Sequence, residues 1–401
     1  MINFIENGSV TTTQGFKAAG IFAGIKRKRK DLALIYSPRP CNVAGTFTIN
    51  KVKAAPLLLS QDVIKNNGLV KAVLVNSGNA NACTGDEGYQ DAVVSQQYVA
   101  NKLGINTNEV LVSSTGVIGQ RMPMNTLMNG IDKIVPELSY EGGLSAAEAI
   151  MTTDTAMKSF AVKFTFDNKP VTIGAICKGS GMIMPNMATM LAFITTDAQI
   201  ENELLSKLLK KAVTNTFNKI SVDGETSTND MVVIMANGLS EVVIDEKNYS
   251  ESVFYDALFT ICTEMAKAIA KDGEGATKLI TVNITGADTQ KDADLAGKSI
   301  ANSPLVKTAV YGNDANWGRI MSSIGMSGAE VKPEKVSVYF DNLPVLLPGF
   351  NVVLDEEKAF KCLNKNEVFI NVNLNGGKYS STWYTCDFTE NYIKINAEYR
   401  S

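Results

Sequence analysis

The sequence predicts a mixed α/β protein, and both its patterning and its composition support this fold class. Short runs of β-branched and apolar residues alternate with longer segments whose apolar residues recur about every three to four positions. Of the 401 residues, 45% are hydrophobic and 20% are charged, so the chain has enough apolar side chains for a sizeable core. This length allows one large domain or about two to three ordinary ones.

Strands are predicted where β-branched residues cluster, and helices where the apolar pattern is amphipathic. The predicted strands cover residues 69–75, 109–113, 159–165, 171–177, 190–195, 231–236, 278–285, 335–340 and 367–373. The predicted helices cover residues 87–103, 123–138, 143–152, 199–218, 251–271 and 288–301. Gly142 and Gly143 mark the start of the third helix, and Asp197 is the predicted cap of the fourth.

The sequence contains no histidine, and this restricts the chemistry open to the protein. Ser-His-Asp and Cys-His mechanisms, His-ligated zinc or iron sites and imidazole acid–base catalysis are all excluded. Proton transfer must therefore use carboxylates, lysine, tyrosine, a thiol or the amine at the start of a chain.

The charge balance argues against nucleic acid and against an anionic membrane as partners. The chain has 38 Lys and Arg against 41 Asp and Glu, a formal net charge of −3, whereas such partners require a clustered basic surface. One basic run covers Lys26–Lys30 and is followed by Asp31 and the apolar residues 32–36. We interpret this run as a solvated turn that precedes a strand.

Cysteine usage and hydropathy predict a cytoplasmic protein. The six cysteines are scattered, form no CxxC pair and are expected to be reduced and mostly buried. The first residues lack the basic and apolar regions of a secretory signal. The most apolar stretch, 182–194, is interrupted by Pro185, Asn186 and Thr189, so no segment reaches the about 18 apolar residues of a membrane span.

Clusters of Gly, Asn, Ser and Thr lie between the predicted elements, at residues 76–82, 113–119, 178–181, 223–230 and 312–318. Each cluster alone is typical of a turn, but together they indicate a functional site. Carboxylates in similar polar settings are Asp154, Asp223, Glu225, Asp230, Glu274 and Asp314. Their spacing matches no calcium loop, and no P-loop or dinucleotide fingerprint is complete, so neither a metal nor a nucleotide cofactor is predicted.

The segment 182–194 has two interpretations. It reads as a pair of buried strands broken at Pro185 and Asn186, in which Thr189 is an ordinary β-branched residue. It also reads as a self-processing site, because a threonine that begins a chain carries its own base, the α-amine. Such an amine has a pKa of about 7.7–8.0, and the small Ala188 leaves room for an acyl shift at the 188–189 bond.

Residues 187–191, Met-Ala-Thr-Met-Leu, resemble the self-cleavage motif of the ornithine acetyltransferase family of arginine biosynthesis, also called glutamate N-acetyltransferase. Further blocks are similar to the family's in the same order and cover essentially the whole chain. They are residues 76–82, 114–119, 152–155, 178–183, 223–230, 272–278, 312–319 and the C-terminal end.

The resemblance implies a role for specific residues. The chain is expected to cleave itself between Ala188 and Thr189, so that Thr189 becomes the acetyl-accepting nucleophile, with the oxyanion hole formed by Thr115 and Gly116. The substrate-contacting positions that it implies are Thr155, Lys178, Thr189, Glu274, Asn396 and Ser401.

The resemblance also implies the fold and the assembly. It predicts a layered α/β sandwich of the self-processing ornithine acetyltransferase type, an α chain of residues 1–188 and a β chain of residues 189–401. Two copies of each chain would form a heterotetramer in the cytoplasm. No metal, no resident cofactor, no nucleic acid and no membrane partner are expected.

The function implied is transfer of an acetyl group from N2-acetyl-L-ornithine to L-glutamate through an acetyl-threonine intermediate. Acetyl-CoA is a further acetyl donor that some family members use, and the sequence leaves its use open. An amidase or aminopeptidase on a similar self-processing scaffold is the nearest alternative. An uncleaved small-molecule binding protein, whose Asn and Gly clusters line a pocket, is an alternative of another class.

Overall fold

The structure is a computed structural model that describes residues 1–66, 68–184, 190–249 and 253–398. The described residues form two compact units. The first unit contains residues 1–180, 190–218 and 226–265, and the second contains residues 181–184, 219–225 and 266–398.

The first unit is built on a nine-stranded sheet with the order β1-β6-β7-β8-β10-β3-β4-β5, in which β2 pairs with β3. Its strands are β1 (Asn3–Phe4), β2 (Lys17–Ile21), β3 (Leu32–Phe47), β4 (Leu69–Asn79), β5 (Val110–Val117), β6 (Lys158–Phe166), β7 (Lys169–Lys178), β8 (Leu191–Thr196) and β10 (Met231–Ala236). A separate pair consists of β9 (Gln199–Ile200) and β11 (Val243–Ile244).

Strand β3 belongs to two arms of this sheet. Its residues 32–36 pair with β2 and β4, whereas residues 42–47 pair with β10. Ile35 and Val73 from one arm share a hydrophobic cluster with Phe193 and Val233 from the other arm. The sheet therefore folds back on itself, and its two arms pack face to face around this cluster.

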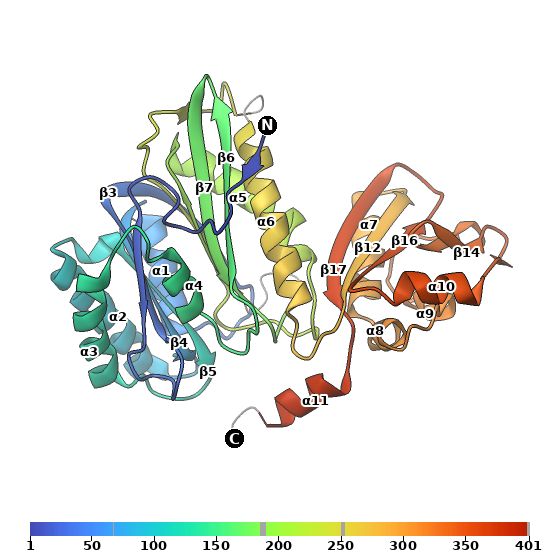
Figure 1. Ribbon diagram of the computed structural model, residues 1–401, viewed down its shortest axis with the longest axis horizontal. Helices are drawn as coiled ribbons and strands as arrows, with labels where there is room; N and C mark the ends of the chain where they lie inside the picture. The colour runs from blue at the N-terminus through green and yellow to red at the C-terminus, as the bar shows by residue number, and fades with distance from the viewer. Residues whose placement is uncertain (67, 185–189, 250–252, 399–401) are drawn as a thin grey trace. The chain divides into compact units, whose positions relative to one another are not determined.

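Helices cover the outer face of each arm. The helices of this unit are α1 (Ala55–Asn66), α2 (Gly85–Leu103), α3 (Met124–Ile134), α4 (Gly143–Ala149) and α5 (Asn202–Asn215), and α6 (Val253–Lys271) begins in it. Leu34 and Leu74 of the sheet pack with Val99 of α2 and Ile131 of α3, so successive residues such as Leu34 and Ile35 face opposite layers. Figure 1 shows α2 and α3 on one side of the strands and α6 on the other.

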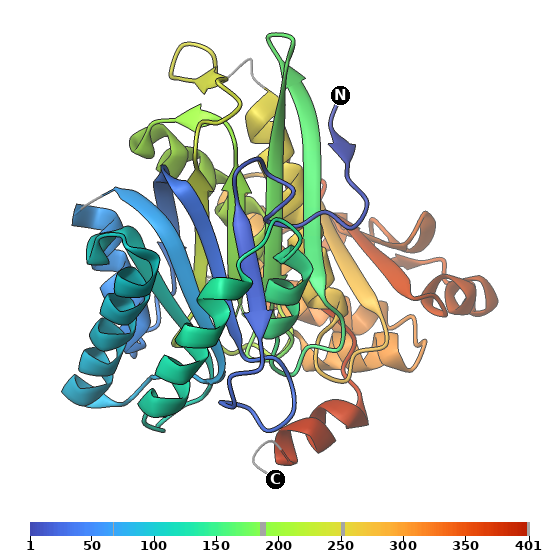
Figure 2. The same ribbon diagram turned by 60° about the vertical axis from the view of Figure 1, so that its left-hand side comes forward.

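This helix–sheet–sheet–helix arrangement confirms the predicted layered α/β sandwich, and nearly all the predicted elements coincide with observed ones. Helix α4 begins at Gly143 with Gly142 as its N-cap, so the prediction that this glycine pair marks the start of the helix is confirmed. The basic run is a loop between β2 and β3, in dark blue below the strands in Figure 2, also as predicted. The cap prediction at Asp197 is wrong: α5 begins at Asn202, because the Asp197 carboxylate instead accepts a hydrogen bond from the Thr172 amide at 2.9 Å.

The second unit is built on a six-stranded sheet with the order β15-β14-β13-β16-β12-β17. Its strands are β12 (Leu279–Ala287), β13 (Ser337–Phe340), β14 (Leu343–Leu347), β15 (Asn351–Val352), β16 (Glu367–Asn373) and β17 (Tyr379–Cys386). Its helices are α7 (Gln290–Asn302), α8 (Pro304–Tyr311), α9 (Trp317–Gly325), α10 (Glu356–Leu363) and α11 (Glu390–Ala397). One hydrophobic cluster joins the sheet to α7, α8, α9 and α10 through residues such as Val282, Ile300 and Ile324.

Short 3-10 turns complete the described elements, at Thr107–Glu109, Val135–Glu137, Phe217–Lys219 and Pro333–Lys335. Within the described ranges, no helix combines the length and the apolar character needed to cross a membrane. All six cysteines are free thiols, and four of them are buried.

Replacement of Phe254 by Ala tests the packing of α6 on the sheet. The Phe254 ring is fully buried and meets the Phe164 ring edge to face at 6.2 Å. Because truncation leaves a cavity, Phe254→Ala should lower the free energy of unfolding by about 3–5 kcal/mol, measured by urea denaturation. Phe259→Ala on the same helix is the control, since Phe259 is 36% exposed, and an equal loss in the two variants would contradict the packing described.

Candidate active site

Strand ends from both arms of the sandwich meet at one edge of the first unit. Lys178, at the end of β7, pairs with Leu191 at the start of β8, and Leu191 pairs with Met231 at the start of β10. Thr189 precedes this point in the chain by two residues and lies outside the described residues, as does Ala188. The segment that follows the predicted cleavage bond therefore enters the sheet beside Lys178.

Asn229 connects this edge to the ends of β4 and β5. Its side-chain amide donates to the carbonyl oxygen of Ala80 at 2.7 Å and to that of Ser114 at 2.8 Å. Three of the polar clusters that the sequence singled out, at 76–82, 113–119 and 223–230, thus contact one another through buried amides. These clusters are far apart in the chain, so only the fold brings them together.

Thr115 and Gly116, the predicted oxyanion-hole residues, lie at the end of β5. Thr115 is buried, and Gly116 pairs with Gly78 of β4. Gly116 has a φ of +134°, and a Cβ atom there would lie 2.3 Å from the carbonyl carbon of Gly78. Only glycine fits this close approach of two backbones. The predicted role of Thr115 and Gly116 in an oxyanion hole is compatible with this fixed backbone. That role stays a prediction.

A buried carboxylate, Asp154, connects the 152–155 block to the 178–181 block. It accepts hydrogen bonds from the Lys158 ammonium at 2.8 Å, the Thr152 amide at 2.9 Å and the Gly179 amide at 2.8 Å. The Lys178 ammonium lies 3.9 Å from the Oδ2 atom of Asp154. Burial alone would raise the pKa of Asp154, but the two lysines hold it well below its usual value.

Asp230 is the second buried carboxylate at this edge. One of its oxygens accepts a hydrogen bond from the Met190 amide at 3.0 Å, and this amide belongs to the peptide bond that joins residues 189 and 190. Within the described part of the chain its other oxygen has no hydrogen-bond partner. Burial raises the pKa of Asp230 well above its usual value, although Lys178 lowers it in part.

The remaining predicted positions are distributed between the two units. Thr155 is exposed and follows Asp154 directly in the first unit. In the second unit, the Asn396 amide donates to the Glu274 carboxylate at 2.8 Å, and Glu274 is only 8% exposed. Ser401 lies outside the described residues.

Two lysines were missed as site residues by the sequence reasoning. Lys158 is almost completely buried against Asp154, and its only signal in the sequence is its i,i+4 spacing from that carboxylate. Lys26 was assigned to a solvated turn, although it is half-buried. Neither position lies in a Gly- or Asn-rich cluster.

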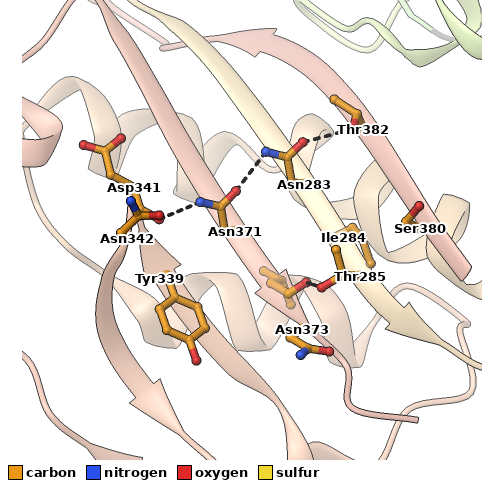
Figure 3. Close-up of a pocket in the computed structure, with 11 residues that line it drawn as sticks. Asn283, Ile284, Thr285, Tyr339, Asp341, Asn342, Asn371, Asn373, Ser380 and Thr382 are labelled. Atoms are coloured by element: carbon orange, nitrogen blue, oxygen red, sulfur yellow. Dashed lines mark hydrogen bonds between the residues drawn. The ribbon is translucent and has the colours of Figure 1, made fainter. Parts of the chain in front are cut away.

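A polar groove of about 590 Å³ lies on the sheet of the second unit (Figure 3). Across it, Thr382 donates to the Asn283 side chain at 2.9 Å, Asn283 donates to Asn371 at 2.8 Å, and Asn371 donates to the Asp341 carbonyl oxygen at 2.6 Å. These amides satisfy one another across neighbouring strands, so the row stabilises the sheet. Among the described residues, no group of three or more His, Cys, Asp or Glu could hold a metal ion.

A family model described as the ArgJ family matches residues 17–401. The chain belongs to this family. It is 48% identical over 402 residues to the arginine biosynthesis bifunctional protein ArgJ of Caldanaerobacter subterraneus, covering 99% of this chain and 100% of that protein. The ArgJ 1 protein of Clostridium acetobutylicum, with the same description, is 50% identical over 406 residues, 100% of this chain and 99% of that protein.

Solved ArgJ structures are also similar in sequence. One is described as ornithine acetyltransferase of Mycobacterium tuberculosis in complex with ornithine. It is 39% identical, covers 46% of this chain and 98% of that chain, and has a TM-score of 0.43. The family resemblance drawn from the motifs is confirmed by the full-length relatives.

Asp154→Asn tests the charge balance of the lysine cluster. The change leaves Lys158 and Lys178 buried without their carboxylate, so it should lower the free energy of unfolding by about 3–5 kcal/mol at neutral pH. Because the folded-state pKa of Asp154 is depressed, its contribution is complete above the unfolded pKa of about 3.9 and is lost as the pH falls further. The difference between the two unfolding curves should therefore stay constant from pH 7 to about pH 4 and begin to narrow between about pH 4 and pH 3.

The control for this prediction is Asp132→Asn, which removes an exposed carboxylate that lies 2.6 Å from Lys102. Exposed ion pairs contribute little, so this variant should differ from the wild-type protein only slightly. A difference between wild type and Asp154→Asn that stays constant across the pH range would contradict the charge argument.

Gly116→Ala tests the close approach of β4 and β5. The added methyl group would collide with the Gly78 backbone, so the variant should show a large fall in melting temperature. Gly119→Ala is the matched control: Gly119 also has a positive φ, of +79°, but a Cβ there has no neighbour within 4 Å. Its cost should be limited to backbone strain of about 1–3 kcal/mol. Equal melting temperatures in the two variants would show that the close approach is not a constraint.

Proposed function

We propose that this chain is a ping-pong acetyltransferase of arginine biosynthesis, which moves the acetyl group of N2-acetyl-L-ornithine to L-glutamate. The observation that carries the proposal is the meeting of Gly116, Lys178 and the segment that follows Thr189 at one edge of a sandwich. The relationship to full-length arginine-biosynthesis proteins at 48–50% identity supports the pathway.

Thr189 is the nucleophile in this proposal. After cleavage of the Ala188–Thr189 bond, its free α-amine accepts the hydroxyl proton as the hydroxyl oxygen attacks the acetyl carbonyl carbon. The backbone amides of Thr115 and Gly116 stabilise the resulting oxyanion, and one such donor is commonly worth about 3 kcal/mol. The ornithine amine leaves with the proton, and the amine of glutamate then attacks the acetyl-threonine.

Two of the proposed contacts carry charges opposite to those of the substrate's charged groups. Lys178 is a buried cation that suits a carboxylate. Glu274 is a carboxylate that suits the ornithine ammonium, and Asn396 holds its side chain by a hydrogen bond. Thr155 and Ser401 complete the proposed contacts.

Three further features belong to the same proposal. The α chain of residues 1–188 and the β chain of residues 189–401 assemble as two copies of each in the cytoplasm. Acetyl-CoA serves as a second acetyl donor, which the word bifunctional in the relatives' names favours. The acetyl group is carried on the protein itself, so the reaction uses no resident cofactor.

Thr189→Ala tests the nucleophile. Because one hydroxyl performs both chain cleavage and acetyl transfer, the variant should remain a single chain and lose transfer activity by at least about a thousandfold. The measurement is the intact mass of the denatured protein before and after exposure to N2-acetylornithine. The wild-type protein should give two chains split at the 188–189 bond, with one acetyl group added to the second chain.

The control is Thr214→Ala, since Thr214 is an exposed residue of α5. This variant should be cleaved and acetylated normally. A Thr189→Ala protein that is cleaved and fully active would refute the mechanism. Steady release of acetate from acetylornithine without glutamate would instead identify an amidase.

A further inference from the structure

Lys26 is the first residue of the basic run, and its backbone is held firmly. The Asp31 carboxylate is buried and accepts hydrogen bonds from the amides of Ala23 at 2.6 Å, Gly24 at 3.0 Å and Lys26 at 2.8 Å. Three amide donors on one carboxylate fix the start of the loop. The position of the Lys26 backbone is therefore determined by the fold.

The Lys26 side chain lies against the glycine pair at the ends of β4 and β5. A Cβ atom on Gly78 would lie 2.7 Å from Cγ of Lys26, and Gly78 is the register partner of Gly116. Beyond this contact, the Lys26 ammonium donates to the carbonyl oxygen of Met151 at 2.8 Å. The ammonium therefore lies between the end of β5, which carries the proposed oxyanion-hole residues, and the segment that leads to Asp154.

The Lys26 ammonium is not paired with a carboxylate in the part of the chain that the structure describes. The Asp154 carboxylate pairs with Lys158 and lies near Lys178, and the Asp31 carboxylate accepts three backbone hydrogen bonds. Burial lowers the pKa of Lys26 to about 8, and the nearby carboxylates offset only part of this effect. Such a site favours an anionic ligand.

We infer that Lys26 binds the side-chain carboxylate of the acetyl acceptor and so selects glutamate. This inference rests on the proposed function. Donor and acceptor share an α-carboxylate and a reacting α-nitrogen, and they differ at the end of the side chain, where ornithine has an ammonium and glutamate a carboxylate. One buried cation, Lys178, suits the shared carboxylate, and a second cation nearby gives the acceptor a partner that the donor does not use.

The remainder of the basic run does not favour a polyanion such as nucleic acid. Lys30 forms an ion pair with Glu148 at 2.8 Å, and the chain as a whole carries a net charge of −3. The stem of Lys26 packs on the strand ends, whereas residues 27–29 are exposed.

The experiment compares Lys26→Gln with the wild-type protein in the two half-reactions. In the variant, KM for glutamate should rise about 10–100-fold, the loss expected for one hydrogen bond to a charged group. The preference for glutamate over glutamine should fall by a similar factor, because glutamine has no side-chain carboxylate. The ornithine burst from N2-acetylornithine, measured without an acceptor, should keep its amplitude. Lys26→Arg, which keeps the charge, should restore most of the preference.

Lys28→Gln is the control, since Lys28 is an exposed residue of the same loop, and it should leave the preference for glutamate unchanged. Lys26→Met keeps the packing of the stem on Gly78 and serves as the second charge-removing variant if Lys26→Gln is unstable. An unchanged glutamate preference would overturn the assignment. Equal losses in both half-reactions would overturn it too, because Lys26 would then bind the carboxylate that both substrates share. Absence of an ornithine burst from the wild-type protein would instead refute the proposed function.

Discussion

Strand β3 is shared by both arms of the first unit's sheet, and the position of the polar strand ends depends on it. Its first residues pair with β4 and its last with β10, so one continuous strand leads the chain from one layer into the other. The starts of β8 and β10 consequently lie at the same edge as the ends of β4 and β5. Asn229 fixes this juxtaposition by donating to backbone carbonyls of the opposite arm.

Charge compensation is the second constraint at this edge. A buried lysine is tolerated when a carboxylate or a hydrogen-bond acceptor offsets its lost hydration. Asp154 does this for Lys158 and, at longer range, for Lys178. Asp230 is a second buried carboxylate at this edge, and Lys178 offsets part of the rise in its pKa that burial causes.

Local elements were predictable because they depend on residues close together in the chain. The hydrophobic period identified helices such as α2 and α7, and β-branched runs identified strands such as β10 and β16. Asp197 shows the limit of this reasoning, because a distant amide, that of Thr172, competes for its carboxylate. Lys26 shows the same limit: a run of charges resembles a solvated turn until the strands that cover its first side chain are known.

The sequence alone identified the family and predicted the chemistry. A chain without histidine, with a threonine at a predicted cleavage bond and with collinear blocks along its length, was enough to propose an acetyl-threonine mechanism. The tertiary structure decided which of those blocks contact one another and which charges are buried. Both properties depend on pairings between residues far apart in the chain, such as Asn229 and Ala80, which are 149 positions apart. Such pairings follow from the way the sheet folds back on itself and not from any local pattern.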